Sequence, residues 1–255
     1  SQIDVDRLDY LNRDSFYSGV AEGIVNSTRI IDMYNVYKGQ LVIDYKGLYT
    51  AEKFLLSRKL MYLQVYMHKT VLSAEHTLMN ILKRAKYLTK KNHKIFTTNN
   101  LKKFLEDSID MTNMNNLNKN LDYFSQLDDY DILISIKEWQ KNDDFILSTL
   151  SKQIIERKLH KIKEVESNEV SIILNRIKEK LSKIHHTNKT DLNYLAFPIR
   201  TKHKIYTPNK NPIYILKEKN HNYVLKGIEK ELKFNKNQST IIKNFICYHP
   251  SLNNL

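Results

Sequence analysis

Apolar residues recur at helical spacing over about residues 51–88, which is the longest regular pattern in the chain. The positions that carry the pattern are Leu55, Leu56, Leu60, Leu63, Met67, Val71, Leu72, Leu78 and Leu82. Thr50 is placed to cap this helix, because its hydroxyl can accept a free amide of the first turn. Only 5 Gly and 4 Pro occur in 255 residues, so few positions would interrupt a helix. We therefore expect a mainly α fold with a long helical spine.

Shorter elements are expected on both sides of the spine. Before it we expect a helix from an Asp4 cap to about Arg13, a loop over 16–23, a helix over 26–31 and a β-hairpin over 34–47. After it we expect a helix over 100–107, a loose segment over 111–120, a helix capped by Asp128 or Asp129 that ends near Trp139, and helices over 145–159 and 170–184. The last part reads as strands over 192–198, 204–206, 212–218, 223–226 and 240–248.

These patterns divide the chain into three segments. Residues 1–90 carry the spine, and residues 91–187 form a helical extension. The composition then shifts toward short strands separated by Pro, Asn and Gly, so residues 188–255 are expected to form a small α+β or β-rich appendage.

Charge and cysteine content limit the possible environments of the chain. Lys and Arg number 41 against 28 Asp and Glu, which gives a net charge of +13 and favours anionic partners such as nucleotides or nucleic acid. A single cysteine excludes a disulfide framework within the chain and fits a reducing compartment. No apolar run is long enough to span a membrane, and the first residues lack a signal peptide's apolar centre. We expect a cytoplasmic protein without membrane contact.

The opening residues concentrate acids, an aromatic residue and arginines. On a helix, Asp6, Tyr10 and Arg13 share one face, while Arg7 and Asp14 lie on a neighbouring face. Carboxylates hold hard cations, and guanidinium groups hold phosphate oxygens. The same pattern is also typical of an ordinary solvated helix with ion pairs between successive turns.

This segment resembles a signature of the HD-domain phosphohydrolases, in particular their deoxynucleoside triphosphate triphosphohydrolase (dGTPase-like) branch. The family pattern D-x-D-[RK]-x-D-Y-x-x-R-D is matched from Asp4 to Asp14. The resemblance implies that Asp6 is a metal ligand and that Arg7 faces the triphosphate. It also implies that Tyr10 and Asp14 contact the nucleoside, with Asp14 reading a sugar hydroxyl.

A second segment resembles the same family. The chain has Arg58 and, later on the expected spine, Tyr66-Met-His68-Lys69. The resemblance implies that Arg58 contacts phosphate, so that Arg7 and Arg58 are the catalytic candidates, and that Tyr66 packs near the sugar. His68, Lys69 and, in a weaker match, Arg157 would face a second nucleotide site.

The chain departs from the family at the residues that give it its name. None of its 9 histidines is followed by Asp, whereas the family takes three of its four metal ligands from a His and a His-Asp pair. We therefore expect the sequence to be the C-terminal portion of an HD-domain helical fold, with those ligands upstream. The divalent ion (Mg, Mn, Fe, Ni or Zn) would bind only when they are present, because such sites need several protein ligands.

Two functions remain open from the sequence, and a third possibility is a decayed gene fragment that retains the motif residues. The first is a metal-dependent phosphohydrolase that converts deoxynucleoside triphosphates to deoxynucleoside and tripolyphosphate, acts as a homo-oligomer and is incomplete in this chain. The second is a catalytically inactive basic helical module that binds nucleic acid or a protein, which the lysine-rich stretch 152–183 would suit. Only the first requires Arg7, Tyr10, Asp14, Arg58 and Tyr66 to converge on one site.

Overall fold

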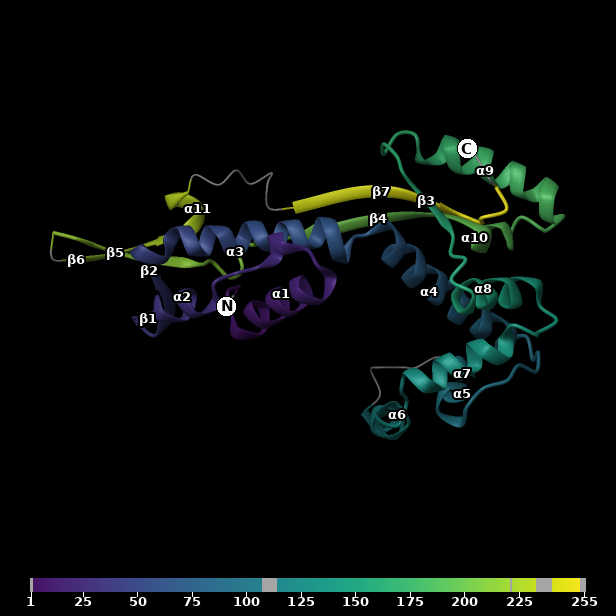
Figure 1. The fold of residues 1–255 in the computed structure, drawn as a ribbon. Coiled ribbons are helices and arrows are strands. Elements are labelled where there is room, and N and C mark those ends of the chain that lie inside the picture. Colours follow the sequence, from purple (N-terminus) through teal and green to yellow (C-terminus); the bar gives the residue numbers. More distant parts are fainter. Residues whose placement is uncertain (1, 107–113, 221, 233–239, 253–255) are drawn as a thin grey trace. The chain divides into compact units, whose positions relative to one another are not determined.

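The computed structural model describes residues 2–106, 114–220, 222–232 and 240–252. It is mainly helical, with two small sheets, as expected (Figure 1). The chain divides into two compact units: unit 1 comprises Ser1–His68 and Arg200–Lys243, and unit 2 comprises Lys69–Ile199 and Asn244–Leu255. Residues 188–255 thus contribute to both units. The division of the chain into three domains, 1–90, 91–187 and 188–255, stays a prediction.

Unit 1 has four helices among its described residues, of which the first two begin where a side chain accepts a free backbone amide. They are α1 (Val5–Ser18), α2 (Ser27–Asp32), α3 (Leu48–Met61) and α11 (Ile228–Glu231), with short 3₁₀ turns at Ala21–Gly23 and Tyr45–Gly47. Asp4 caps α1 and Asn26 caps α2 through their side-chain oxygens. The first helix continues beyond the expected end at Arg13 and stops before Gly19. Gly19 has a φ of 72°, a left-handed conformation that glycine adopts easily because it has no Cβ. The expected loop over 16–23 is thus partly helical.

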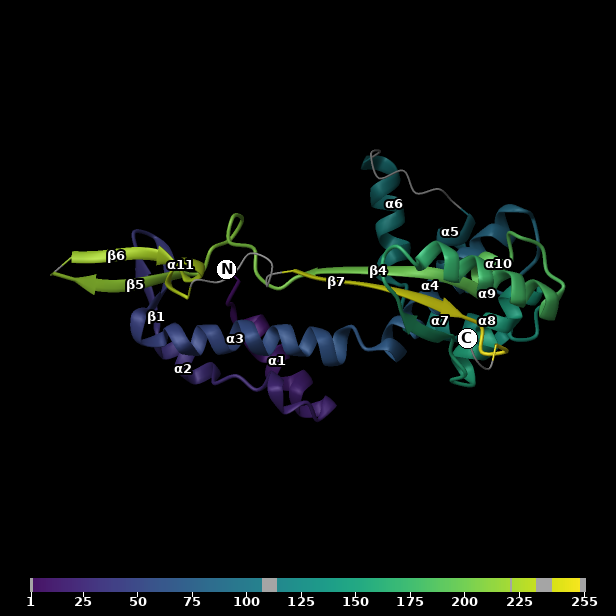
Figure 2. The ribbon, with the colours of Figure 1, turned by 90° about the horizontal axis from the view of Figure 1, so that it is seen from above.

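A four-stranded sheet completes unit 1. Its order is β1 (Tyr34–Tyr37), β2 (Gln40–Asp44), β5 (Tyr214–Lys219) and β6 (Asn222–Gly227). Lys38 and Gly39 both have positive φ, the geometry of a tight two-residue hairpin turn, so the predicted hairpin is confirmed. Strand β5 pairs parallel to β2 and antiparallel to β6 (Figure 2). A distant segment of the sequence therefore closes this sheet.

The long spine is interrupted, contrary to the expectation of one helix over 51–88. Helix α3 begins at Leu48 without a side-chain cap, so Thr50 is not the cap. The chain then makes a π-helical turn, η3 (Tyr62–Tyr66), before α4 (Lys69–Lys90) starts. The Met67 amide donates to the Tyr62 carbonyl at 2.8 Å, a wider closure than an α-helical bond. Apolar residues continue through the interruption, so their periodicity did not reveal it.

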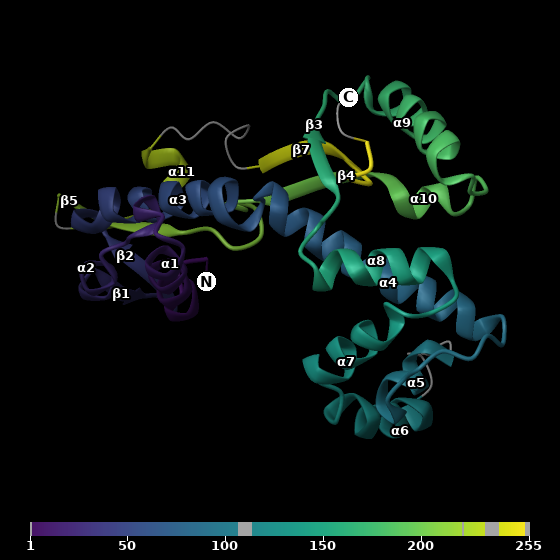
Figure 3. The ribbon, with the colours of Figure 1, turned by 45° about the vertical axis from the view of Figure 1, so that its right-hand side comes forward.

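Unit 2 is built around α4 and six further helices. They are α5 (Asn99–Glu106), α6 (Met114–Ser125), α7 (Asp129–Trp139), α8 (Phe145–Ile155), α9 (Val170–His185) and α10 (Leu192–Leu195). The caps Asp128 and Asp144 hold the first turns of α7 and α8. Helix α8 packs against α4, and α7 packs against α8 (Figure 3). The loose segment expected over 111–120 is helical from Met114, and residues 111–113 lie outside the described residues.

An ion-paired arginine and an indole fix the interior of unit 2. Arg84 on α4 binds Asp144 at 2.6 Å and Asp191 at 2.8 Å, so it ties α8 and the start of α10 to α4. Trp139 is 1% exposed, and its indole nitrogen donates to the Phe96 carbonyl at 2.8 Å. Paired charges and a satisfied indole can be buried without a large desolvation cost.

The second sheet has the order β3 (Lys161–Glu164), β7 (Thr240–Tyr248) and β4 (Ala196–Lys204). The sequence did not predict β3, which has only four residues, three of them charged. The strand expected over 192–198 is helical up to Leu195 and extended from Ala196. Cys247 on β7 is fully buried, and burial raises the pKa of its thiol to about 12. No helix among the described residues combines the length and apolarity that crossing a bilayer requires.

A buried histidine of unit 2 is only partly hydrogen-bonded. His160 is 3% exposed, and its Nδ1 lies 3.1 Å from the Thr77 hydroxyl, while its Nε2 is buried without a partner. Burial, together with the neighbouring His249, lowers the pKa of His160 to about 3. The folded state therefore holds this imidazole neutral.

Acid should destabilise unit 2 through His160. Between pH 6.5 and about 3 the unfolded chain protonates this imidazole and the folded chain does not, so the free energy of unfolding falls as the pH falls, by up to ~1.4 kcal/mol per pH unit. Urea unfolding, followed by the fluorescence of Trp139, should show a shallower pH dependence in His160→Gln. The exposed control His186→Asn should keep the wild-type slope; equal slopes in all three proteins would contradict the assignment.

Candidate functional site

The first turn of α1 holds Arg7 beside its own cap. The Asp4 carboxylate accepts the Arg7 amide at 3.0 Å and also pairs with the Arg7 guanidinium. The Arg7 side chain remains 30% exposed. Capping and ion pairing thus fix an arginine at the amino end of the helix, where the backbone amides add positive potential.

The next two turns of α1 meet the π-helical turn. The Tyr66 hydroxyl donates to Asp14 Oδ2 at 2.6 Å, and the rings of Tyr10 and Tyr66 lie edge to face with centroids 6.2 Å apart. Tyr10 and Asp14 are one turn apart on α1, so both reach the same partner. Arg13 instead forms an exposed ion pair with Asp9, so it does not join Tyr10 as its helical position suggested.

The π-helical turn also aligns a second tyrosine. The rings of Tyr62 and Tyr66 are 5.1 Å apart, and Tyr62 lies 5.0 Å from the ring of His203 on β4. A single extra residue in a helical turn re-aims the side chains on either side of it. The turn therefore presents two phenol rings to α1 and β4 at once.

Arg58 is buried beneath these rings. It is 8% exposed, and its Nη1 donates to the Ile205 carbonyl at 2.9 Å. Its guanidinium carbon lies 5.8 Å from the centre of the Tyr62 ring, and its Nε is buried without a partner. No carboxylate among the described residues pairs with it. A buried cation normally has a carboxylate partner, so the guanidinium of Arg58 is available to bind an anion.

We call these residues the tyrosine–arginine cluster: Arg7, Tyr10, Asp14, Arg58, Tyr62, Tyr66 and His203. Burial raises the pKa of the Tyr10 phenol, while the positive charges of Arg58 and Arg7 act in the opposite direction. Burial also raises the pKa of Tyr66, and the hydrogen bond to the Asp14 carboxylate adds to the effect. Both phenols are therefore protonated donors near neutral pH, next to two guanidinium groups.

The described residues do not make a metal site by themselves. Asp6 is exposed on α1, and no group of three potential ligands occurs in the described parts of the chain. One carboxylate is too small a donor set for a transition-metal ion or Mg²⁺. The metal-binding role of Asp6 stays a prediction that needs donors from elsewhere.

The residues assigned to a second nucleotide site fall in different units. His68 is the last residue of unit 1, whereas Lys69 and Arg157 belong to unit 2. All three are exposed. Their convergence stays a prediction.

The sequence did not indicate Tyr62 and His203 as cluster members. Tyr62 lies one turn from both Arg58 and Tyr66, so helical spacing could have found it. His203 had no local signal, because a strand far along the chain delivers it.

Comparisons with known proteins place this geometry in a wider context. The family model for the HD associated region matches residues 25–120, which include Arg58 and Tyr66. The uncharacterized protein YwfO of Bacillus subtilis is 35% identical over 169 residues, which are 66% of this chain and 37% of YwfO. The uncharacterized protein MJ1154 of Methanocaldococcus jannaschii is 34% identical over 152 residues, which are 54% of this chain and 32% of that protein.

One solved structure matches almost the whole of this chain. The crystal structure of a phosphohydrolase from Bacteroides thetaiotaomicron superposes with a TM-score of 0.84 at 34% identity, covering 97% of this chain and 62% of that chain. Together with the match to the HD associated region, this similarity supports an HD-domain-related family for the chain. A hypothetical protein from Aquifex aeolicus, at 24% identity and a TM-score of 0.56, covers 97% of this chain and 54% of its own and shares the fold.

The matched proteins are longer than the region of similarity. The chain spans 37% of YwfO, 32% of the archaeal protein and 62% of the phosphohydrolase chain. The similarity therefore concerns a part of those proteins, and membership of the triphosphohydrolase branch stays a prediction.

The hydrogen bond between Tyr66 and Asp14 can be tested by titration. Replacing Asp14 with Asn removes the negative charge that disfavours the phenolate, so the pKa of Tyr66 should fall, while burial keeps it above the ordinary value. Carbon-13 NMR of labelled tyrosines would follow the titration, with Tyr66→Phe assigning the resonance. Asp9→Asn is the matched control on the same helix and should leave Tyr66 unchanged; an identical shift in both variants would contradict the contact.

Proposed function

We propose that the tyrosine–arginine cluster binds the phosphates and sugar of a deoxynucleoside triphosphate, as part of a metal-dependent phosphohydrolase. The observation that carries the proposal is the buried guanidinium of Arg58, which has a carbonyl partner, an unpartnered Nε and no described carboxylate. A phosphate oxygen would supply the missing charge and acceptor. The relation to the HD-domain family and the structural match to a phosphohydrolase support a hydrolytic role.

Each cluster residue has a role that its position allows. Arg58 and Arg7 would contact phosphate oxygens and neutralise charge that develops during hydrolysis. Tyr10 and Tyr66, as protonated phenols, would donate to the sugar or pack against it, and Asp14 would accept a sugar hydroxyl. Hydrolysis at the α-phosphate would release deoxynucleoside and tripolyphosphate.

Under this proposal, most of the metal ligands come from residues that are not in this sequence. Asp6 would be one ligand of a divalent ion, and a His and a His-Asp pair from outside this chain would be the others. Self-association as a homo-oligomer and a cytoplasmic location remain predictions from the sequence.

The alternative, a basic binding module, has less support from the structure. In the stretch 152–183, Lys158 pairs with Glu156 and Lys183 pairs with Glu179, while Lys178 donates to Asn193. Lysines engaged by neighbouring side chains contribute less to a field that attracts a polyanion. The alternative also gives no reason for a buried arginine without a carboxylate.

Nucleotide binding should depend on the two arginines of the cluster. Isothermal titration with each of the four deoxynucleoside triphosphates should show binding that weakens by about tenfold to a hundredfold in Arg7→Gln and in Arg58→Gln, because each loses a charge-assisted hydrogen bond to phosphate. Arg13→Gln is the matched control, since Arg13 pairs with Asp9 in solvent. Circular dichroism would verify that Arg58→Gln folds. Unchanged affinity in both cluster variants would remove the arginines from the site.

The chain by itself should be inactive. With Asp6 as a lone carboxylate, we expect metal analysis to find no stoichiometric transition metal and chromatography to find no tripolyphosphate after incubation with deoxynucleoside triphosphates and Mg²⁺ or Mn²⁺. The control is the same assay on the phosphohydrolase from B. thetaiotaomicron. Robust turnover by this chain would show that its own residues complete the metal site.

A further inference from the structure

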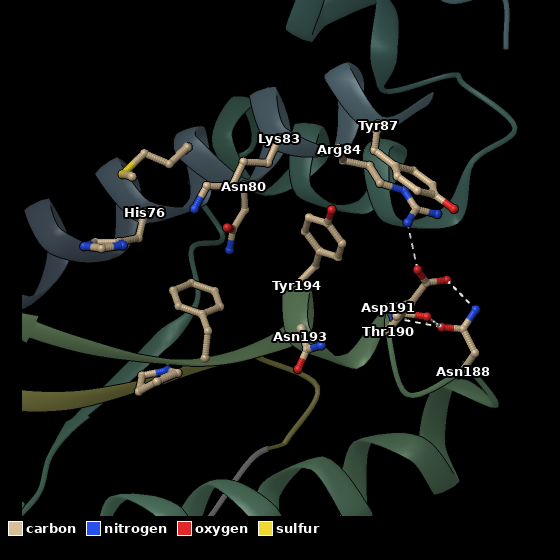
Figure 4. Close-up of a pocket in the computed structure, with 13 residues that line it drawn as sticks. His76, Asn80, Lys83, Arg84, Tyr87, Asn188, Thr190, Asp191, Asn193 and Tyr194 are labelled. Carbon is tan, nitrogen blue, oxygen red and sulfur yellow. Dashed lines mark hydrogen bonds and ion pairs between the residues drawn. The ribbon is translucent and has the colours of Figure 1, made fainter. Parts of the chain in front are cut away.

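Unit 2 contains a cavity that the proposed hydrolytic site does not use. It has a volume of about 650 Å³, within the range of small-molecule sites. Every residue that lines it belongs to unit 2, and none belongs to the tyrosine–arginine cluster. One wall is the face of α4 that carries His76, Asn80 and Lys83, and the opposite wall is the segment that carries Asn193 and Tyr194 (Figure 4).

The helical wall follows from spacing. His76, Asn80, Lys83 and Tyr87 recur every three or four residues, so α4 presents them on one face. The opposite wall is aromatic, because Tyr194 lies in α10 and Phe197 follows on β4. The ring of Phe197 lies 6.2 Å from that of His76, at an interplanar angle of 31°. The walls thus offer flat surfaces for a planar ring.

Of the described residues that line the cavity, Lys83 carries a positive charge that no carboxylate balances. Arg84 also faces the cavity, but Asp144 and Asp191 pair with its guanidinium at 2.6 and 2.8 Å and more than balance its charge, and the rings of Tyr87 and Tyr194 flank it at 5.2 and 5.4 Å. Lys83 is exposed and has no ion pair in the described part of the chain. Its ammonium group can therefore meet a single anionic group of a ligand.

Two uncharged side chains on the α4 wall can form hydrogen bonds with the polar edge of a ligand's ring. Burial, together with the charge of Lys83, lowers the pKa of His76, so its imidazole is neutral at pH 7 with one donor and one acceptor. The half-buried carboxamide of Asn80 has no hydrogen bond among the described residues. Asn188 and Asn193, by contrast, are occupied by Thr190 and Lys178. Recognition thus falls to His76 and Asn80.

We propose that this cavity binds a nucleoside monophosphate, with the base between Phe197 and Tyr194, its edge on Asn80 and His76, and its single phosphate on Lys83. A planar nitrogen heterocycle matches the aromatic wall and the paired donors and acceptors. One lysine matches one phosphate group, whereas a triphosphate would need several cations. Free phosphate would leave the aromatic wall unused. This site is separate from the proposed hydrolytic function and does not depend on it.

The test is calorimetric titration of the chain with adenosine, guanosine, cytidine and uridine 5′-monophosphates, with the four nucleosides and with inorganic phosphate. At least one monophosphate should bind about tenfold or more tightly than its nucleoside and than phosphate. Lys83→Gln should remove the advantage of the nucleotide over the nucleoside, and Phe197→Leu should weaken both. Lys90→Gln, an exposed position of α4 outside the cavity, is the matched control and should change nothing.

Location and folding need their own controls. Tyr66→Phe alters the cluster in unit 1 and should leave monophosphate binding unchanged, while Trp139 fluorescence during thermal unfolding should show that Lys83→Gln and Phe197→Leu remain folded. Failure of every monophosphate to bind at millimolar concentration would overturn the proposal. So would equal binding of inorganic phosphate, or binding that Lys83→Gln and Phe197→Leu leave intact.

Discussion

The burial of Arg58 constrains unit 1 more than any other single contact. A guanidinium can leave water only where acceptors replace its hydration, and here the acceptor is the Ile205 carbonyl, 147 residues along the chain. That bond joins α3 to the end of β4. The same distant segment supplies β5, which pairs with β2 and completes the sheet. The residue that we propose to bind an anion, Arg58, is thus also a long-range connection between segments.

The π-helical turn follows from the same arrangement. A regular α-helix through residues 62–66 would place Tyr62 and Tyr66 about a turn apart along one stripe, because their spacing is four residues. The inserted residue opens the turn, so that Tyr66 reaches Asp14 while Tyr62 covers Arg58 and meets His203. A π-helical turn loses regular α-helical hydrogen bonds, and it persists where surrounding contacts offset the loss. Here those contacts are the ones that Tyr62 makes with Arg58 and His203 and that Tyr66 makes with Asp14.

Local signals predicted local structure well. The Asp4 cap, the hairpin at Lys38–Gly39 and the Asp128 cap depend on a few neighbouring residues, and each is confirmed. The interruption at Tyr62–Tyr66 could not be predicted from apolar periodicity, because Leu63 and Met67 continue the pattern through it. The partners that cross-link the site, the Ile205 carbonyl and His203, are set by tertiary packing and had no signal in the sequence.

The candidate site likewise combines features that the sequence predicted with contacts that only tertiary packing determines. Spacing on α1 placed Tyr10 with Arg13, yet the structure pairs Tyr10 and Asp14 through Tyr66, because the partner helix decides which stripe of α1 is covered. The grouping of Arg58 with Tyr66 came from a family resemblance, and physical reasoning alone would have left both in a long core helix. In the structure both residues lie against the ring of Tyr62, whereas their contact with substrate stays a proposal.

The two buried arginines of this chain illustrate why charge balance, and not arginine content, distinguishes a structural group from a binding group. Arg84 has two carboxylate partners, so its charge is balanced within the contacts that hold α4, α8 and the start of α10 together, and Lys83 is the cation that the adjacent cavity can offer to a ligand. Arg58 has a carbonyl and an aromatic face, neither of which neutralises it. Burying a cation in this state costs free energy. An anion that arrives with its own negative charge would recover that cost, and this makes Arg58, and not Arg84, the group around which a phosphate site can form.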